Sequence, residues 1–187
     1  MFSKENLKKA WDYVWKGEGI IPLILNIIIA FLVVKYLIYP GLGFIFNTNL
    51  PVVAVVSGSM SHNSLDFNAW WEQNQAFYNE KGISKEKFFS FPIKNGFNKG
   101  DIMVLYGTKI ENIKVGDVVV YKSSLYAYPV IHRVVNINTT FETKGDHNQI
   151  SDPNKVNSEQ ILGKAILRIP YLGWVKVVFT DITRSVR

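Results

Sequence analysis

The sequence predicts a mainly β protein, an antiparallel β-sheet domain with a small helical insertion, behind one N-terminal transmembrane helix. Three observations predict this fold class. An uncharged apolar run covers residues 19–34, and short segments rich in β-branched and aromatic residues recur over residues 52–169. Between the first two of those segments, residues 61–99 carry aromatic residues at helical spacing. Short strands separated by turns are typical of antiparallel sheets or barrels rather than of alternating βαβ units.

The composition supports a folded protein and excludes several kinds of site. A chain of 187 residues suits one domain plus a short extra element. With 48% hydrophobic and 19% charged residues, disorder is not expected. The chain has no cysteine, which excludes disulfides, thiolate metal sites and a cysteine nucleophile. The net charge of +6 comes from scattered lysines and arginines, so a solvated surface is favoured and no nucleic-acid partner is expected.

Residues 1–19 form a polar, lysine-rich N-terminal segment. Its apolar residues Ala10, Trp11, Val14 and Trp15 lie at helical spacing. This pattern predicts a helix that lies at a membrane surface.

Residues 20–40 are predicted to form a transmembrane anchor. They reach the roughly 20 apolar residues that a helix needs to cross a bilayer. Pro22 suits a first helical turn, and Lys35 near the far end can reach the headgroups. A cleaved secretory signal is one alternative, but its apolar region is shorter and a small-residue cleavage site follows it. A buried helix of a soluble domain is the other, and the lysine-rich flank favours insertion over it.

Charge predicts the orientation of this anchor. Lysines 4, 8, 9 and 16 precede it, whereas no lysine or arginine lies between Tyr36 and Glu80. The positive-inside rule therefore predicts a single-pass protein of the cell membrane with a cytoplasmic N-terminus. Residues 41–187 would form a domain outside the cytoplasm.

Six segments of this domain are predicted as strands, and turn residues separate them. They are residues 52–56, 101–106, 117–122, 130–137, 141–144 and 161–169. Residues 61–99 are predicted as a helical insertion that Asp66 caps, because Phe67, Trp70, Trp71, Phe77 and Tyr78 recur at helical spacing. These aromatic residues either pack against the domain or contact the membrane interface or a partner.

A candidate nucleophile follows the first predicted strand, in Ser57-Gly58-Ser59-Met60. A serine beside glycine just past a strand end can be held exposed on a tight turn with backbone N–H groups nearby. A serine nucleophile needs that accessible hydroxyl and those donors. An ordinary polar turn would have the same sequence.

The chain has three histidines that could serve as a base. Alternation puts His132 on the same strand face as Val130 and Val134, where a polar side chain needs a partner. An imidazole there is suited to accept a serine proton at neutral pH. His62 lies in a polar run and is predicted to be a solvated loop residue, and His147 lies in a turn.

Asp146 and Asp152 are candidates for a carboxylate that orients the imidazole. Aspartates are also common in ordinary turns. The run from Gly145 to Asn148 could suggest a metal loop, but no histidine or acidic cluster with ligand spacing supports a metal. No metal and no organic cofactor are expected.

At these residues the sequence resembles type I signal peptidases, and within them the archaeal and endoplasmic-reticulum branch. Four kinds of box carry the likeness, in the family's order and behind an N-terminal anchor. They are S-G-S-M at 57–60, two G-D-h-h-h-Y stretches at 100–106 and 116–121, V-I-H-R-V at 130–134, and G-D-x-N with a later aspartate at 145–152. Bacterial members carry a lysine base where this chain has His132, so the likeness is to the Ser–His type.

The resemblance implies a role for each of these residues. Ser59 would be the nucleophile and His132 the general base. Asp152 would be the orienting acid, with Asp146 as a supporting carboxylate that shares or replaces that role.

The resemblance also implies an oxyanion hole that contains the Ser59 backbone N–H. Ser57 and Met60 are the other candidate oxyanion or substrate-binding residues. The chain departs from the family after this box, because Ser61-His62-Asn63 replaces the usual acidic residue or methionine followed by proline. This departure leaves the details of the substrate groove open.

The function implied is that of a membrane-bound serine endopeptidase. It would remove N-terminal signal peptides from exported precursors through an acyl-enzyme, after small residues at −1 and −3. Its partners would be those precursors and membrane lipid, and accessory subunits stay open. Two alternatives are a peptidase that cuts one dedicated partner and a non-enzymatic, membrane-tethered β-domain.

Overall fold

The computed structural model describes residues 3–178. The outermost parts of the predicted segments 1–19 and 41–187 therefore lie outside the described residues. The chain divides into two compact units, Met1–Ile45 and Phe46–Arg187, and each is described by itself.

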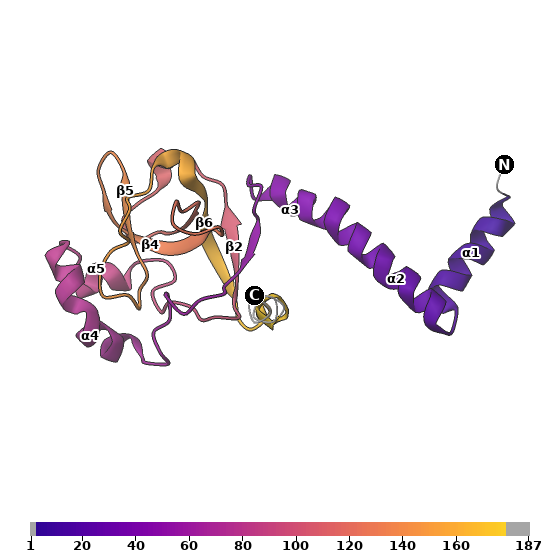
Figure 1. The fold of residues 1–187 in the computed structure, drawn as a ribbon, viewed down its shortest axis with the longest axis horizontal. Coiled ribbons are helices and arrows are strands. Elements are labelled where there is room, and N and C mark those ends of the chain that lie inside the picture. The colour runs from indigo at the N-terminus through magenta and orange to yellow at the C-terminus, as the bar shows by residue number, and fades with distance from the viewer. Residues whose placement is uncertain (1–2, 179–187) are drawn as a thin grey trace. The chain divides into compact units, whose positions relative to one another are not determined.

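The first unit consists of helices. Helix α1 (Lys4–Lys16) begins at Ser3, whose hydroxyl accepts a hydrogen bond from the Asn6 N–H at 3.3 Å. Helix α2 (Ile20–Val33) follows after a short turn, and the Asn26 side chain donates to the Val14 carbonyl at 2.8 Å. Figure 1 shows α1 set at an angle to α2.

The apolar helix continues beyond α2 through a π-helical turn, Val34–Ile38, into α3 (Tyr39–Ile45). In the π-helical turn the Tyr39 N–H donates to the Val34 carbonyl, five residues back. Pro40 has no N–H to donate, and a π-helical turn is one way in which a helix adjusts beside a proline. The whole helix spans Ile20–Ile45, 26 residues, with the length and composition of a membrane-spanning helix.

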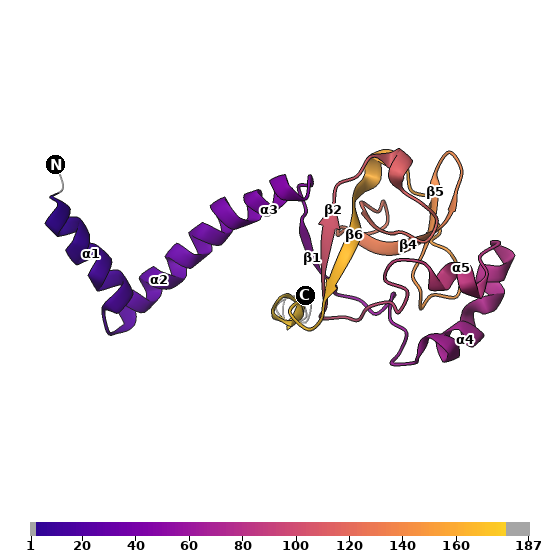
Figure 2. The ribbon, with the colours of Figure 1, turned by 180° about the vertical axis from the view of Figure 1, so that it is seen from behind.

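The second unit is built around one six-stranded sheet with the order β1-β2-β6-β3-β4-β5, in which all neighbours are antiparallel. The strands are β1 (Val52–Ala54), β2 (Ile102–Tyr106), β3 (Val118–Tyr121), β4 (Val130–Ile137), β5 (Phe141–Lys144) and β6 (Ile161–Ile169). Each lies within a segment that the sequence predicts as a strand. The mainly β fold class is therefore confirmed, and Figure 2 shows the sheet from behind.

Both faces of the sheet are covered, because every residue of β3 is buried. Val118 and Val120 pack into one core cluster, and Val119 and Tyr121 pack into another. Alternate residues of a strand point to opposite faces. A central strand buried on both faces fixes the register of β4 beside it, so that His132 lies opposite Val119.

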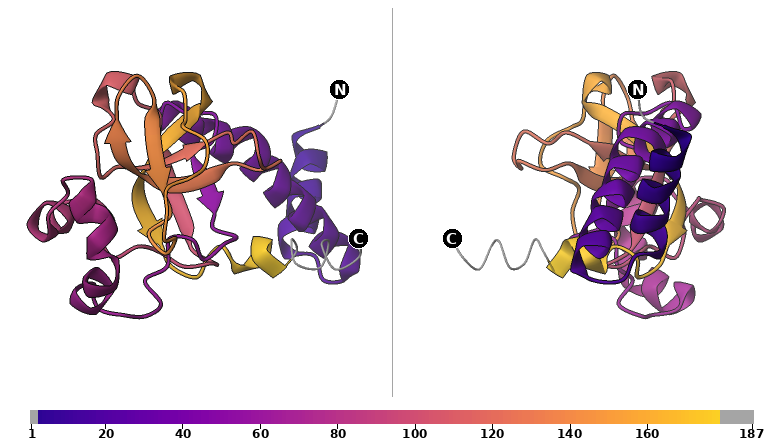
Figure 3. Two further views of the ribbon diagram at one scale, coloured as in Figure 1. Left: turned by 60° about the vertical axis from the view of Figure 1, so that its left-hand side comes forward. Right: turned by 90° about the vertical axis from the view of Figure 1, so that its right-hand side faces the viewer.

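The predicted helical insertion contains α4 (Phe67–Glu80) and α5 (Lys85–Phe89). As predicted, Asp66 caps α4, since its carboxylate accepts the Ala69 N–H at 2.9 Å. The insertion packs against β4 through a cluster of buried residues: Trp70, Trp71, Tyr78, Ile83, Phe88 and Val135. Packing against the domain is therefore confirmed for these aromatic residues. Figure 3 shows the two helices together at one side of the sheet.

Candidate active site

Ser59 lies on a turn directly after β1. The chain leaves the sheet after Val55, whose N–H donates to the Asp101 carbonyl at 2.9 Å. The turn is closed by the Ser61 N–H, which donates to the Gly58 carbonyl at 2.9 Å. Ser59 is half-buried, while Gly58 is exposed with open space where a Cβ would lie. The serine hydroxyl is thus held at the surface by a short turn tied to the sheet.

His132 faces this hydroxyl from β4. Its Nε2 lies 2.9 Å from the Ser59 Oγ. The imidazole is almost buried, with 9% of its side chain exposed. The tertiary fold therefore brings together two residues that are 73 positions apart in the sequence.

Asp152 holds the other nitrogen of the same ring. The His132 Nδ1 lies 2.9 Å and 2.8 Å from the two carboxylate oxygens. The carboxylate also accepts hydrogen bonds from the Thr143 hydroxyl at 2.6 Å and the Tyr121 hydroxyl at 2.9 Å. Burial disfavours the ionised carboxylate. The hydrogen bonds from His132, Thr143 and Tyr121 outweigh burial, so the pKa of Asp152 lies below its usual value.

An ionised carboxylate can only accept hydrogen bonds, so the His132 Nδ1 carries the proton. Its Nε2 is then a free acceptor for the Ser59 hydroxyl. A hydroxyl, an imidazole and a carboxylate in this order can remove the serine proton and stabilise the imidazolium that results.

The two other residues predicted beside the nucleophile lie differently. The Ser57 hydroxyl is exposed and lies 3.2 Å from the Ser59 hydroxyl. The Met60 side chain is buried in the core, with 1% exposed. The Met60 carbonyl accepts the Phe97 N–H at 3.0 Å, so this residue connects the nucleophile turn to the core.

Asp146 lies in a separate, fully buried cluster. Arg133 holds its carboxylate with two hydrogen bonds, of 2.8 Å from Nε and 2.7 Å from Nη2. Tyr78 donates a third at 3.3 Å. Burial disfavours ionisation, but Arg133 outweighs it and holds the pKa of Asp146 far below its usual value. Among the described residues, Arg133, Tyr78 and His62 hydrogen-bond this carboxylate, and His132 does not.

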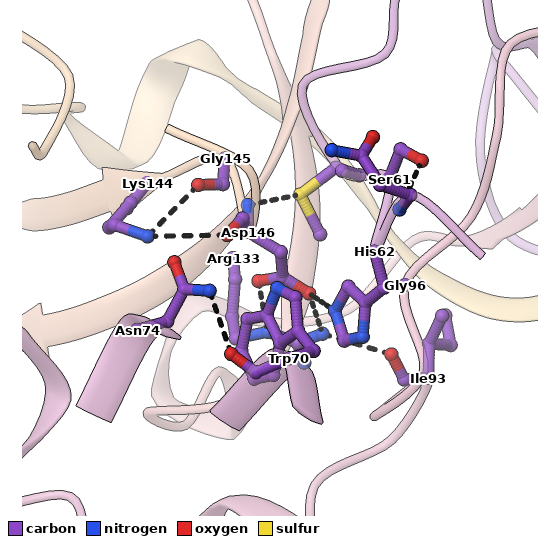
Figure 4. A network of polar contacts seen from close by, with 12 residues as sticks. Ser61, His62, Trp70, Asn74, Ile93, Gly96, Arg133, Lys144, Gly145 and Asp146 are labelled. Carbon is purple, nitrogen blue, oxygen red and sulfur yellow. Dashed lines mark hydrogen bonds and ion pairs between the residues drawn. The ribbon is translucent and has the colours of Figure 1, made fainter. Parts of the chain in front are cut away.

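His62 also belongs to this cluster, and the prediction that it is a solvated loop residue is wrong. Only 5% of the residue is exposed. Its Nε2 lies 3.2 Å from Asp146, and its ring stacks on Trp70. Figure 4 shows the imidazole beside the Asp146 carboxylate. His147, in contrast, is exposed.

Sequence reasoning missed the hydroxyls that surround Asp152. Tyr121 pairs with Val130, and Thr143 pairs with Val134. These are the two neighbours of His132 on its own strand face. Correct strand pairing would therefore have placed both hydroxyls beside the imidazole.

Within residues 3–178, no group of three or more histidine, cysteine or acidic residues could hold a metal ion.

Comparisons with known proteins identify relatives of the chain. No protein-family model matches the chain. The signal peptidase complex catalytic subunit sec11 of Schizosaccharomyces pombe is 31% identical over 171 residues, which cover 84% of this chain and 82% of the yeast protein. The SEC11 subunit of Komagataella phaffii is 26% identical over 164 residues, covering 78% and 76%.

The human catalytic subunit SEC11C is 24% identical over 158 residues, which cover 78% of this chain. The chain spans 65% of the length of that relative. The match to the fission yeast protein extends over most of both sequences. The chain therefore belongs to the family of signal peptidase catalytic subunits.

Proposed function

We propose that this protein is a membrane-bound serine endopeptidase that removes N-terminal signal peptides from exported precursor proteins. The observation that carries the proposal is the contact of 2.9 Å between the Ser59 hydroxyl and the His132 Nε2. Asp152 lies at the opposite nitrogen, at 2.8 Å. Membership of the signal peptidase family supplies the class of substrate.

In the proposed reaction the Ser59 Oγ attacks the carbonyl carbon of the scissile peptide bond. His132 takes the hydroxyl proton at Nε2, and Asp152 stabilises the imidazolium. We place the oxyanion near the Ser59 backbone N–H and the Ser57 hydroxyl, which can both donate hydrogen bonds. His132 then protonates the leaving amine, and the C–N bond breaks to give an acyl-enzyme.

Water completes the cycle. His132 takes a proton from the water molecule, and the hydroxide attacks the ester carbonyl that joins the signal peptide to Ser59. The ester C–O bond breaks, and the serine regains its proton from His132. No cofactor or metal takes part in this scheme.

The apolar helix would confine the enzyme to the membrane of its substrates. We propose that residues 20–40 form the core of a single-pass anchor of the cell membrane. The N-terminal segment 1–19 would be cytoplasmic, and the domain 41–187 would lie outside. Enzyme and precursor would then share one surface, which raises their effective concentration.

The test is cleavage of signal-bearing precursors by the detergent-solubilised full chain with lipid present, with mass spectrometry of the product. We expect the wild type to cut at the signal junction and Ser59→Ala not to cut. A precursor with a bulky residue at −1 serves as a control that should stay intact. Cleavage of only one among several unrelated precursors would favour a dedicated peptidase. If the folded wild type cut none of them, the proposed function would fail.

A further inference from the structure

A second histidine–aspartate pair lies behind the nucleophile, and the proposed reaction does not use it. His62 and Asp146 are both buried, with 4% and 0% of their side chains exposed. Burial of two such groups costs free energy unless they are paired and hydrogen-bonded. Their contacts therefore indicate what the pair does.

The His62 ring is fixed on two sides. It stacks on Trp70 of α4, with ring centroids 3.9 Å apart and planes 1° from parallel. On another side lies Gly96, where an added Cβ would come within 2.7 Å of the His62 ring and 2.2 Å of the Met60 carbonyl. Gly96 has φ +61°, which also favours glycine. The imidazole is thus held in one orientation between the helical insertion and a glycine turn.

That orientation directs the His62 Nε2 at the Asp146 carboxylate, 3.2 Å away. The carboxylate is ionised beside Arg133, so the His62 nitrogen that faces it carries the proton and donates. His62 therefore holds Asp146 from the side of the nucleophile loop, while Arg133 holds it from β4. Figure 4 shows both side chains converging on this carboxylate.

The turn that contains Asp146 touches the backbone of the nucleophile. The His147 N–H donates to the Ser59 carbonyl at 2.8 Å. The Asp146 N–H points at the Met60 sulfur, 3.3 Å away. An added Cβ on Gly145 would lie 2.6 Å from the Ser59 carbonyl. A shift of the Asp146 turn would therefore be transmitted directly to Ser59.

We propose that His62 is a positioning residue for Ser59. Its hydrogen bond fixes the Asp146 turn, which in turn fixes the Ser59 carbonyl, and its stacking on Trp70 connects the helical insertion to the nucleophile. This inference rests on the proposed function for its kinetic consequence. It gives the insertion at 61–99 a role within the catalytic domain.

Two substitutions of His62 separate its hydrogen bond from its shape. His62→Gln keeps a donor near the position of Nε2, whereas His62→Phe keeps a flat ring on Trp70 and removes the donor. We expect kcat to fall roughly tenfold in His62→Phe with KM unchanged, because a small displacement of a reacting group is costly. His62→Gln should restore kcat to within about threefold of the wild type.

Trp71→Phe is the matched control. Trp71 is buried in the same aromatic cluster, so this change loosens the insertion and leaves the His62 hydrogen bond in place. We expect its kcat to stay within about twofold of the wild type. Equal losses in His62→Gln and His62→Phe, or no loss in His62→Phe, would overturn the proposal.

Amide hydrogen exchange tests the same link without any substrate. In His62→Phe, the His147 N–H should exchange faster relative to the Val134 N–H of β4, which donates to the backbone carbonyl of Asp117 at 2.8 Å. An unchanged ratio of the two rates would overturn the proposal. If the wild type cut no precursor, the proposed function would fail, and the exchange ratio would still decide whether His62 positions Ser59.

Discussion

The two histidine–aspartate pairs of the catalytic domain contain the same chemical groups in different surroundings. His132 and Asp152 approach to 2.8 Å, and 14% of the Asp152 side chain is exposed. His62 and Asp146 are 3.2 Å apart and more deeply buried. The other donors to Asp152 are neutral hydroxyls, whereas Asp146 is held by the guanidinium of Arg133.

This difference determines what each imidazole can do. Because Arg133 already neutralises Asp146, a proton added to His62 would bring a surplus positive charge into a buried site. Asp152 has no guanidinium or ammonium among its hydrogen-bond donors within residues 3–178, so its carboxylate can form an ion pair with an imidazolium at His132. Only His132 also directs its second nitrogen at a hydroxyl. A histidine–aspartate pair is thus suited to base catalysis by its neighbours and not by its own geometry.

The largest effect that tests this contrast is loss of the nucleophile or the base. We expect Ser59→Ala and His132→Ala each to lower the rate of precursor cleavage by roughly four orders of magnitude or more. Both variants should keep the thermal unfolding midpoint of the wild type within a few degrees. Ser158→Ala, at an exposed serine of a 3₁₀ turn, is the control. Substantial cleavage by purified His132→Ala would mean that another group is the base.

Exchanging aspartate for asparagine in the two pairs should give opposite outcomes. In Asp152→Asn the new amide would offer an N–H to the His132 Nδ1 and favour the tautomer whose Nε2 cannot accept the serine proton. We expect this change to lower kcat roughly 10³- to 10⁴-fold with a small change in stability. Asp146→Asn leaves the buried Arg133 without its counter-ion and should reduce the free energy of unfolding by about 3–5 kcal/mol.

Urea unfolding of the solubilised protein and cleavage assays well below the unfolding midpoint measure both effects. Equal losses of kcat in the two variants would remove the distinction between the pairs. In that case Asp146 would share the orienting role that the resemblance to the family leaves open.

The sequence predicts the fold better than it predicts the buried pair, for a physical reason. The strands are encoded locally, by β-branched residues such as Val118–Val120 and by the turns between them. The setting of His62 depends on Trp70, on Gly96 and on Asp146, 84 residues away. A polar flanking sequence cannot reveal a partner at that distance, and a local reading therefore places the imidazole in solvent.

Local sequence also cannot decide between Asp146 and Asp152 as the partner of His132. Both aspartates lie in one loop region after β5, six positions apart in the sequence. Only the pairing of β4 with β5, with Val134 opposite Thr143, determines which carboxylate reaches His132. Spacing alone identifies the candidates, and tertiary structure separates their contacts.

A smaller effect, the change of stability with pH, should reveal whether Arg133 is the sole counter-ion of Asp146. Lys144 is fully buried, and its ammonium contacts the Gly145 and Asp146 carbonyls and the ring of Phe77. Burial lowers the pKa of Lys144 from 10.5 to about 8. Between these values the folded state releases a proton that the unfolded state keeps, so stability rises with pH.

We expect the free energy of unfolding to gain about 1–2 kcal/mol from this group between pH 8 and pH 9.5. Lys144→Met should abolish that gain and keep kcat. Burial raises the pKa of Tyr78 above its usual value, so this phenol ionises only in the unfolded state over this range. That ionisation begins near the upper end of the range and lowers the free energy of unfolding by only about 0.2 kcal/mol. Urea unfolding at the two pH values measures the difference. A wild type that loses stability over this range would show that the Lys144 ammonium is needed beside Asp146.

The smallest effect comes from the tyrosine that each aspartate binds. Tyr121 donates to Asp152 at 2.9 Å, and Tyr78 donates to Asp146 at 3.3 Å. Tyr121→Phe should lower kcat about three- to tenfold, since the carboxylate that stabilises the imidazolium loses one donor. Tyr78→Phe should reduce the free energy of unfolding by about 1 kcal/mol and change kcat less than about twofold, because Arg133 and His62 still hold Asp146. Measuring both quantities for both variants completes the comparison. A stability loss without a rate loss in Tyr121→Phe would mean that the Tyr121 hydroxyl serves only the stability of the fold, as we expect of the Tyr78 hydroxyl.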